Sequence, residues 1–289
     1  MVKQPRVTII TDSSSCLPRE LQKSNGIIIV PHLLITDGIA YRDGIDIEPS
    51  QFYHLLQKNK DISTTSGPNP LAFLEAFLKA SAQGNEILCL TLSPRFSAST
   101  FDSAKIAARL AQEKHPKLKI NVIDSQAAAG AEGLIALEAA RTSLRGKSLD
   151  MVTARVEELI PRVQLLAFLD TLRYLGKSGK IPKMKVWAGS LLRFKPLTEL
   201  SQGDARLLAK PRSRAKAMEQ LIHIVSERMG GRPVHINVMH ADAPNDAAEL
   251  SRRVRNLLNC HEIFISEFTP VMGAHTGPGL LGLAFYSDC

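Results

Sequence analysis

EILCLTLSPRFSASTFDSAKIAARLAQEKHPKLKINVID, residues 86–124, is the stretch that decides the fold class. It opens with an apolar run at 86–92 and closes with a second one at 118–124, and each has the length of a buried strand. Residues 99–113, which lie between them, read as a helix. A strand, a helix and a second strand in this order predict a right-handed βαβ crossover between two parallel strands.

The rest of the first half continues this alternation. VTIITD (7–12) and IIIVPHLLI (27–35) read as further strands. Helices are expected between and after them, at about 17–24, 49–58, 70–82 and 131–144. We therefore expect an N-terminal α/β domain that is built on a parallel sheet, over residues 1–155.

The second half has a different pattern. The turn SQGD at 201–204 separates two apolar runs and predicts a hairpin, which joins antiparallel strands. Around it, strands are expected at 163–170, 234–240, 262–268 and 281–286, and helices at 148–160, 214–229 and 245–258. This pattern predicts a C-terminal α+β domain with a mixed or antiparallel sheet, over residues 156–289.

Composition narrows the class of protein. The 289 residues are 44% hydrophobic and 22% charged, which is ordinary for a soluble globular protein. No stretch approaches the roughly 18 consecutive apolar residues that span a bilayer, and no signal-peptide pattern is visible. The four cysteines are scattered, without a C-x-x-C pair, which suits a reducing compartment. We therefore expect a cytoplasmic protein.

The formal net charge of +8 raises the possibility of a nucleic-acid partner. The basic residues are dispersed, however, and aromatic residues make up only 5% of the chain. The densest basic clusters lie at 177–185 and 210–216. Solvated faces or an anionic protein partner are therefore favoured over nucleic acid.

Hydroxyl side chains gather where strands of the first half end. They occur in TDSSS (11–15), STTS (63–66), SPRFSAS (93–99) and IDS (123–125). Ligands bind outside the carboxyl ends of the strands in open α/β sheets, and the N–H groups at a helix start favour an anion. The alternative is that each residue only caps a helix, and that Asp12 and Asp124 hold their loops in shape.

The stretch VMGAHTGPGLLGLAFY (271–286) contains Gly277-x-Gly279-x-x-Gly282, the spacing of a dinucleotide-binding loop. Such a loop must open a helix within a βαβ unit, whereas LGLAFY, which follows here, reads as a strand. We therefore predict a tight connection where the backbone closely approaches a ligand or another part of the chain, and no cofactor.

Histidines in the second half raise two further possibilities. His275 is either a structural residue or part of a site. His235, His240 and Asp242 are candidate metal ligands, but the two histidines are an odd distance apart on a strand and face opposite sides, so we expect no metal. No hydrolase elbow, Walker loop or kinase signature is present, so we assign no catalytic residue.

Seven motifs, taken together and in order, resemble the DegV family over residues 11–286. They are TDSSSCLP, TTSGPNP, LSPRFSAST, VIDSQ, DTLRYLGKSGKI, LLRFKPLTEL and GAHTGPGLLGLAFY. The resemblance implies a bacterial protein that binds a long-chain fatty acid in a tunnel between its two domains. It further implies a carrier without catalytic activity of its own, which presents the carboxylate to a separate ATP-dependent kinase subunit and contacts a membrane surface only transiently.

The resemblance also implies which residues bind the carboxylate. Thr65 lies in the Thr-Ser-x-Pro motif, Ser97 and Ala98 match the Ser-Gly turn of the family, and His275 matches the histidine of its C-terminal glycine motif. Ala98 replaces the usual glycine and adds a methyl group where the ligand approaches. A supporting rim is expected from Asp12, Ser13, Thr64, Ser66, Thr276 and Gly277.

Four basic residues, Lys177, Lys180, Lys183 and Arg212, are the expected docking residues for the kinase subunit. Lys180 stands where the family usually has arginine, so it keeps the charge and loses the bidentate geometry.

Two other functions stay open at this point. A fold-level likeness to the substrate domain of dihydroxyacetone kinases implies an enzyme with His275 as a covalent anchor. A regulatory or nucleic-acid-binding protein is suggested by the charge alone. A long apolar cavity would favour the acyl carrier, a small polar one the kinase, and salt-dependent binding the nucleic-acid protein.

Overall fold

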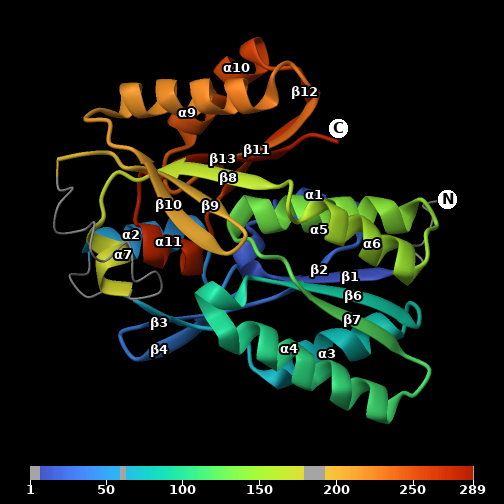
Figure 1. Cartoon of the computed structure of the whole chain (residues 1–289). Helices are drawn as coiled ribbons and strands as arrows, with labels where there is room; N and C mark the ends of the chain where they lie inside the picture. The colour runs from blue at the N-terminus through green and yellow to red at the C-terminus, as the bar shows by residue number, and fades with distance from the viewer. Residues whose placement is uncertain (1–6, 59–62, 179–192, 289) are drawn as a thin grey trace.

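A computed structural model of the chain describes residues 7–58, 63–178 and 193–288. Helical layers alternate with two large sheets, which lie one above the other (Figure 1). Among the described residues, no helix combines the length and the apolar character needed to cross a membrane.

The first sheet is parallel throughout, in the order β2-β1-β6-β7. Its strands are β1 (Thr8–Asp12), β2 (Ile28–Val30), β6 (Glu86–Thr91) and β7 (Lys119–Asp124). Helices α3 (Pro70–Ser81) and α4 (Pro94–Lys114) cover one face, and α5 (Ala129–Leu144) and α6 (Leu149–Leu159) cover the other (Figure 1). The expected βαβ unit at 86–124 is therefore present, as β6, α4 and β7.

The second sheet is mixed, in the order β10-β9-β8-β13-β11-β12. Its strands are β8 (Gln164–Phe168), β9 (Leu197–Ser201), β10 (Asp204–Ala209), β11 (Val234–His240), β12 (Cys260–Glu267) and β13 (Leu281–Tyr286). Only β11 and β12 run parallel, and the hairpin expected at SQGD joins β9 to β10. Helices α9 (Arg214–Met229) and α10 (Pro244–Leu257) cover its outer face (Figure 1). The predicted α/β class, with one parallel and one mixed sheet, is confirmed.

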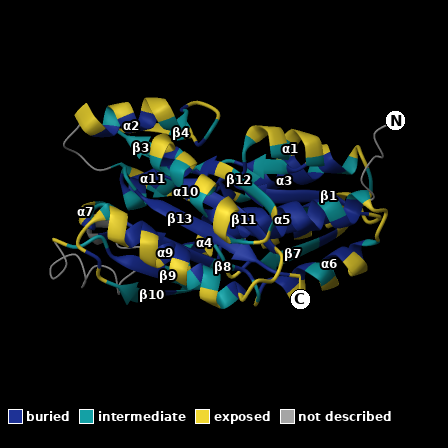
Figure 2. Cartoon of the chain, turned by 90° about the horizontal axis from the view of Figure 1, so that it is seen from above, coloured by how far each residue is buried: buried dark blue, intermediate teal, exposed yellow. Residues whose placement is uncertain are grey.

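Helix α5 lies between the two sheets and contacts β1 and β6 on one side and β8, β11 and β13 on the other. Fourteen of its 16 residues are buried, so it has no solvent-facing stripe (Figure 2). This helix joins the halves of the molecule into one core. The proposed domain boundary at residue 155 falls inside the next helix, α6.

A third, small sheet in the order β4-β3-β5 extends from the first half, with β3 (Leu33–Thr36), β4 (Ile39–Arg42) and β5 (Thr64–Ser66). Helices α1 (Arg19–Asn25), α2 (Pro49–Lys58) and α7 (Arg173–Ser178) and the short η1 (Ser13–Ser15) complete the described structure with α11 (Pro270–Thr276). α11 packs against α2, α7, β3 and β5. A segment from the end of the chain thus lies on the small sheet near its beginning.

Two expectations about these segments were wrong. The single strand expected at 27–35 divides into β2 and β3 at Pro31, which has no N–H for a ladder and lets the chain pass from one sheet to another. The connection expected at 271–286 begins as helix α11, with Pro270 in its first turn.

Candidate functional site

A cavity lies between segments of the two halves, bounded by residues from η1, β5, α4, α5, β8, β9 and α11. Its wall is mainly apolar, with Leu92, Phe96, Leu165, Leu169 and Leu200 among its residues. The volume of the cavity, counted as the space that the centres of water molecules can occupy, is about 110 Å³. A single ordered water needs about 10–15 Å³ by the same measure. The cavity is therefore several times larger than one ordered water needs, and its wall suits apolar groups.

Thr65 and His275 meet at this cavity, although they are 210 residues apart in the chain. The Thr65 hydroxyl lies 2.9 Å from Nε2 of His275. Side chains alternate along β5, so Thr65 faces the cavity while Thr64 and Ser66 are exposed on the other face. His275 stands in the last turn of α11.

Two glycines bring α11 to this position. A Cβ on Gly273 would lie 2.5 Å from the Tyr53 hydroxyl of α2, so only glycine lets the two helices pack this closely. Gly277 ends α11 with φ of +71°, and a Cβ there would lie 2.1 Å from the Tyr174 ring. The glycines of this stretch thus let α11 approach α2 and α7 closely, as the composition predicts.

Ser97 interrupts helix α4 with non-helical dihedrals, φ −154° and ψ 88°. Its hydroxyl accepts a hydrogen bond from Thr100 at 3.1 Å and lies 3.3 Å from the Ser99 hydroxyl. A Cβ on Gly67 would lie 2.7 Å from Thr100 Oγ1, so the segment after Thr65 runs along this turn. Thr65, Ser97 and His275 all line the cavity, and we call them the polar trio.

A second polar group, buried beneath the cavity wall, contains two carboxyls. Asp12 accepts hydrogen bonds from the Ser14 N–H and hydroxyl and from the Leu92 N–H, and it lies 3.0 Å from Nε2 of His32. Glu132, on α5, contacts the hydroxyls of Thr11 and Ser14, each at 2.8 Å. Neither carboxyl is exposed to solvent.

The surroundings shift the pKa values of the two carboxyls of this group in opposite directions. Burial raises the pKa of Glu132 well above the ordinary value, and the nearby charge of Asp12 adds to the rise. Burial alone would also raise the pKa of Asp12, but the charge of His32 and the hydrogen bonds from His32, Ser14 and Leu92 hold it below the ordinary value. Of the two carboxyls, Glu132 is thus the one that holds a proton more readily.

The structure places the remaining predicted site residues outside the polar trio. Ser13 donates to Asp43 at 2.6 Å and, like Ala98, does not line the cavity. Asp12 is fully buried and holds a loop in shape. Thr276 lines the cavity, but its hydroxyl bonds to the backbone oxygen of Met272. Of the predicted rim residues, therefore, only Thr276 lines the cavity.

Sequence reasoning missed three residues of the second polar group: Ser14 as a cavity residue, His32 and Glu132. A signal for Glu132 was present, because it is a lone acid in the apolar run AAAGAEGLIAL (127–137). No comparable signal marked His32, which lies between two strands that were expected to be one.

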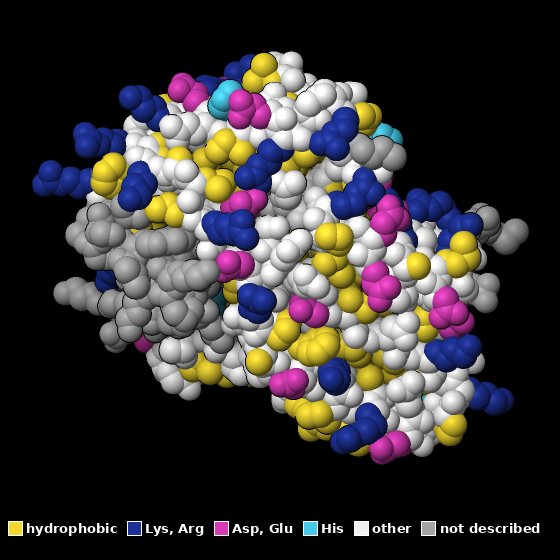
Figure 3. Space-filling model, in the orientation of Figure 1, with side chains coloured by type: hydrophobic (Ala, Val, Ile, Leu, Met, Phe, Trp, Pro, Cys, Tyr) yellow, Lys and Arg dark blue, Asp and Glu magenta, His cyan; other side chains and the backbone are white. Residues whose placement is uncertain are grey.

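Of the predicted docking residues, Lys180, Lys183 and the side chain of Lys177 lie outside the described part of the chain. Arg212 is exposed, and its guanidinium lies 5.5 Å from the Phe194 ring centre. On the face shown in Figure 3, Lys and Arg side chains are interspersed with Asp and Glu. Among the described residues, no group of His, Cys, Asp and Glu is arranged to hold a metal ion.

Comparison with known proteins agrees with the fold and the motifs. The model of a family described as uncharacterised proteins of the DegV family matches residues 6–288. A DegV domain-containing protein of Streptomyces coelicolor, SCO2569, is 36% identical over 283 residues, which cover 97% of this chain and 98% of the relative.

Solved structures give the same result. A Thermus thermophilus DegV family protein described by its fatty acid binding is 30% identical, with a TM-score of 0.87 over 98% of this chain and 99% of that one. DegV of Bacillus subtilis, described as a fatty acid binding protein, is 25% identical, with a TM-score of 0.86 over 98% and 100% of the two chains. The chain belongs to the DegV family.

Proposed function

We propose that the protein binds a long-chain fatty acid in the cavity between its two domains and that the polar trio holds the carboxylate. The observation that carries this proposal is the pairing of Thr65 with His275 at a cavity that Ser97 also lines and whose wall is mainly apolar. The description of the Thermus and Bacillus relatives as fatty acid binding supports it.

The polar trio suits a carboxylate that has left water. Such a group must be hydrogen-bonded, or it takes up a proton instead. Hydroxyl groups of Thr65 and Ser97 can donate to its oxygens, and the His275 ring can donate from one nitrogen. None of these side chains needs a full positive charge, so an oxygen of the carboxylate keeps its nucleophilic character.

The acyl tail would supply most of the affinity. At about 0.8 kcal/mol for each buried methylene, fourteen methylenes contribute about 11 kcal/mol, against association costs of about 4–15 kcal/mol. The headgroup contacts would fix how far the tail enters the cavity.

We further propose that the bound carboxylate is presented to a separate ATP-dependent kinase subunit, which forms the acyl phosphate, and that this chain has no catalytic activity alone. The family motifs support this role, as does the lack of a phosphate-binding motif in the sequence. A cytoplasmic location fits the same role and stays a prediction. The test is to incubate ATP and fatty acid with this chain alone and with the kinase subunit; acyl phosphate in the first mixture would contradict the carrier role.

The dihydroxyacetone kinase alternative is less well supported. A triose site needs a small polar pocket, whereas the cavity here is lined mainly by leucine, alanine, phenylalanine and methionine. Nothing in the geometry requires His275 to form a covalent bond, because it already pairs with Thr65.

The first test of lipid binding is mass spectrometry of acid-denatured purified protein. We expect fatty acids to be released in an amount comparable with the protein. The matched control is the variant Thr65→Val, which keeps the shape of the side chain and loses the hydroxyl, and which should release less. A native protein that carries no fatty acid and takes none up on incubation would contradict the proposal.

A further inference from the structure

Two polar side chains of the cavity wall share a buried carboxylate and do not belong to the polar trio. They are Ser14 and His32, and we call them the polar strip. Both contact the same atom, Oδ1 of Asp12, and the His32 backbone N–H donates to the neighbouring Ser13 hydroxyl. We propose that the polar strip binds a hydroxyl group on the acyl chain, so that the ligand class is a hydroxy fatty acid. This inference rests on the proposed function.

The number of hydrogens in the buried group shows which hydrogen bonds the strip can still make to a ligand. The Ser14 hydroxyl has one hydrogen but contacts two carboxyl oxygens, one of Asp12 and one of Glu132. One carboxyl must therefore be protonated. Asp12 receives two N–H groups and lies beside His32, whereas Glu132 receives only hydroxyl contacts. Glu132 is thus the acid that donates.

With Glu132 donating to Ser14 and Ser14 donating to Asp12, every hydrogen in the chain of contacts is used. A hydroxyl oxygen accepts two hydrogen bonds, so the Ser14 oxygen keeps one lone pair. The His32 ring uses Nε2 toward Asp12, and its Nδ1 has no hydrogen bond to the part of the chain that the structure describes. The strip therefore offers the Ser14 oxygen as an acceptor and the second ring nitrogen of His32 as a further hydrogen-bonding group to whatever fills the cavity.

A hydroxyl, which can both donate and accept a hydrogen bond, fits these two groups better than a plain methylene does. A methylene against the strip leaves the free Ser14 lone pair and the second ring nitrogen of His32 without a partner. The hydroxyl hydrogens of Thr198 and Thr276 are already donated to the backbone oxygens of Ala167 and Met272, so what distinguishes the strip from these hydroxyls is the second ring nitrogen of His32.

The position of the strip indicates where on the acyl chain the hydroxyl must be. His32 directly precedes β3, in which Leu34 pairs with Thr65. Two residues along a strand correspond to about 7 Å, so His32 lies near the polar trio. The preferred ligand therefore carries its hydroxyl near the carboxyl end.

The experiment compares binding of hexadecanoic acid and of two hydroxy derivatives, one with the hydroxyl near the carboxyl group and one with it at the methyl end. The full chain is first freed of lipid. We expect the first derivative to bind about three- to tenfold more tightly than hexadecanoic acid, as one net hydrogen bond allows. The methyl-end derivative should bind no more tightly than hexadecanoic acid.

The variants Ser14→Ala and His32→Gln should each reduce this ratio toward one. His32→Gln keeps an N–H donor for Asp12, which separates ligand recognition from support of the buried group. The control His223→Ala changes an exposed histidine that does not line the cavity, so the ratio should persist.

Equal binding of hexadecanoic acid and the first derivative by the native chain would overturn the inference, as would a ratio that survives both variants. Because the native chain gives this ratio without any substitution, a variant that fails to fold does not prevent the test. If neither acid binds, the proposed function fails as well, so the two failures are distinguishable.

Discussion

His275 is the residue on which the candidate site depends most directly. Its Nε2 lies 2.9 Å from the Thr65 hydroxyl, and the two residues come from opposite ends of the chain. The ring is held at the end of a helix that two glycines allow to pack closely on Tyr53 and Tyr174. The position of the imidazole is thus fixed by backbone packing rather than by its own side-chain contacts alone.

We predict that His275→Ala weakens binding of hexadecanoic acid about three- to tenfold, because it removes one hydrogen bond worth about 0.5–1.5 kcal/mol. The ratio of affinities for hexadecanoic and octanoic acid should stay the same, since the tail contacts are kept. Titration calorimetry measures both. The control is His223→Ala, which changes an exposed histidine on α9.

A purely structural histidine would give another result. In that case His275→Ala would lower the melting temperature, and the folded protein would bind hexadecanoic acid with unchanged affinity.

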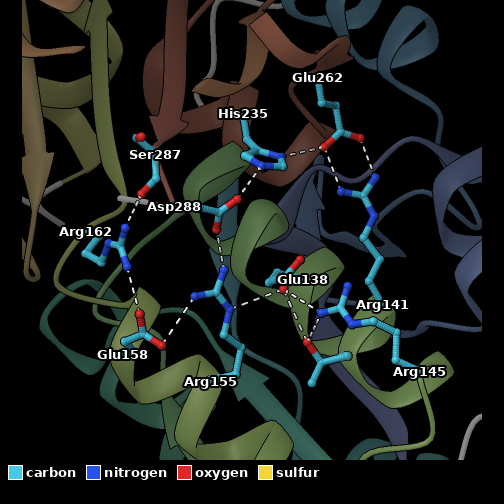
Figure 4. A network of polar contacts seen from close by, with 11 residues as sticks. Glu138, Arg141, Arg145, Arg155, Glu158, Arg162, His235, Glu262, Ser287 and Asp288 are labelled. Atoms are coloured by element: carbon cyan, nitrogen blue, oxygen red, sulfur yellow. Dashed lines mark hydrogen bonds and ion pairs between the residues drawn. The ribbon is translucent and has the colours of Figure 1, made fainter. Parts of the chain in front are cut away.

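At the scale of elements, a network of charged side chains ties α5 and α6 to the second sheet (Figure 4). His235 on β11 lies between Glu262 of β12 at 3.3 Å and Asp288 at 3.0 Å, and its ring stacks on Tyr286. Glu262 also pairs with Arg141 of α5. Further contacts are made by Glu138, Arg145, Arg155, Glu158, Arg162 and Ser287. The network thus holds the C-terminal residues Ser287 and Asp288 close to the region of α5 and α6.

This network predicts a pH dependence of stability. Burial lowers the pKa of His235, but Glu262 and Asp288 outweigh it, so the pKa is raised above 6.5. A raised histidine pKa stabilises the fold at pH values below 6.5 and loses this effect as the pH rises through the folded-state value. The melting temperature should therefore fall between about pH 6 and pH 9, and by less in His235→Asn.

Glu262 gives the opposite dependence on the acidic side. Burial would raise its pKa, yet Arg141 and His235 lower it to about 2. Its contribution to the stability of the fold is present above about pH 4.5 and is lost as the pH falls toward 2.

The role assigned to His235 has its own test. A melting temperature that does not change from pH 6 to pH 9, or that changes equally in His235→Asn, would contradict it.

Elements with local signals were predictable from the sequence, and those set by distant contacts were not. The βαβ unit at 86–124 follows from strand and helix patterns alone. The β3–β4 hairpin was missed, although Asp37-Gly38 is a hairpin signal and both residues have positive φ. The division at Pro31 and the helix at 270–276 depend on packing against the small sheet, which no local pattern shows.

The candidate site shows the same limit. Hydroxyls at strand ends and a glycine-rich segment indicated a rim, but the roles of Thr65, Ser97 and His275 came from resemblance to a family. Their meeting depends on α11 crossing to the small sheet, a contact between residues 210 positions apart. Glu132 had a signal that was overlooked, whereas His32 had none.

At the scale of the whole molecule, the cavity is lined by residues from both halves and by Ala129 at the start of the buried helix α5. Neither half encloses it alone, because its wall takes Leu92 and Phe96 from the first half and Leu165 and Leu200 from the second. A ligand that fills this space would therefore contact both halves. An apolar ligand suits it, since most of the wall is apolar.

The central claim is that an acyl tail fills this cavity, and chain length tests it most directly. Affinities of the lipid-free protein are measured for saturated fatty acids from octanoic to hexadecanoic acid under one set of conditions. At about 0.8 kcal/mol per methylene, the eight additional methylenes correspond to about 6 kcal/mol. We predict that affinity rises steadily along the series and that hexadecanoic acid binds at least about a thousandfold more tightly than octanoic acid. Equal affinity for octanoic and hexadecanoic acid would contradict the account.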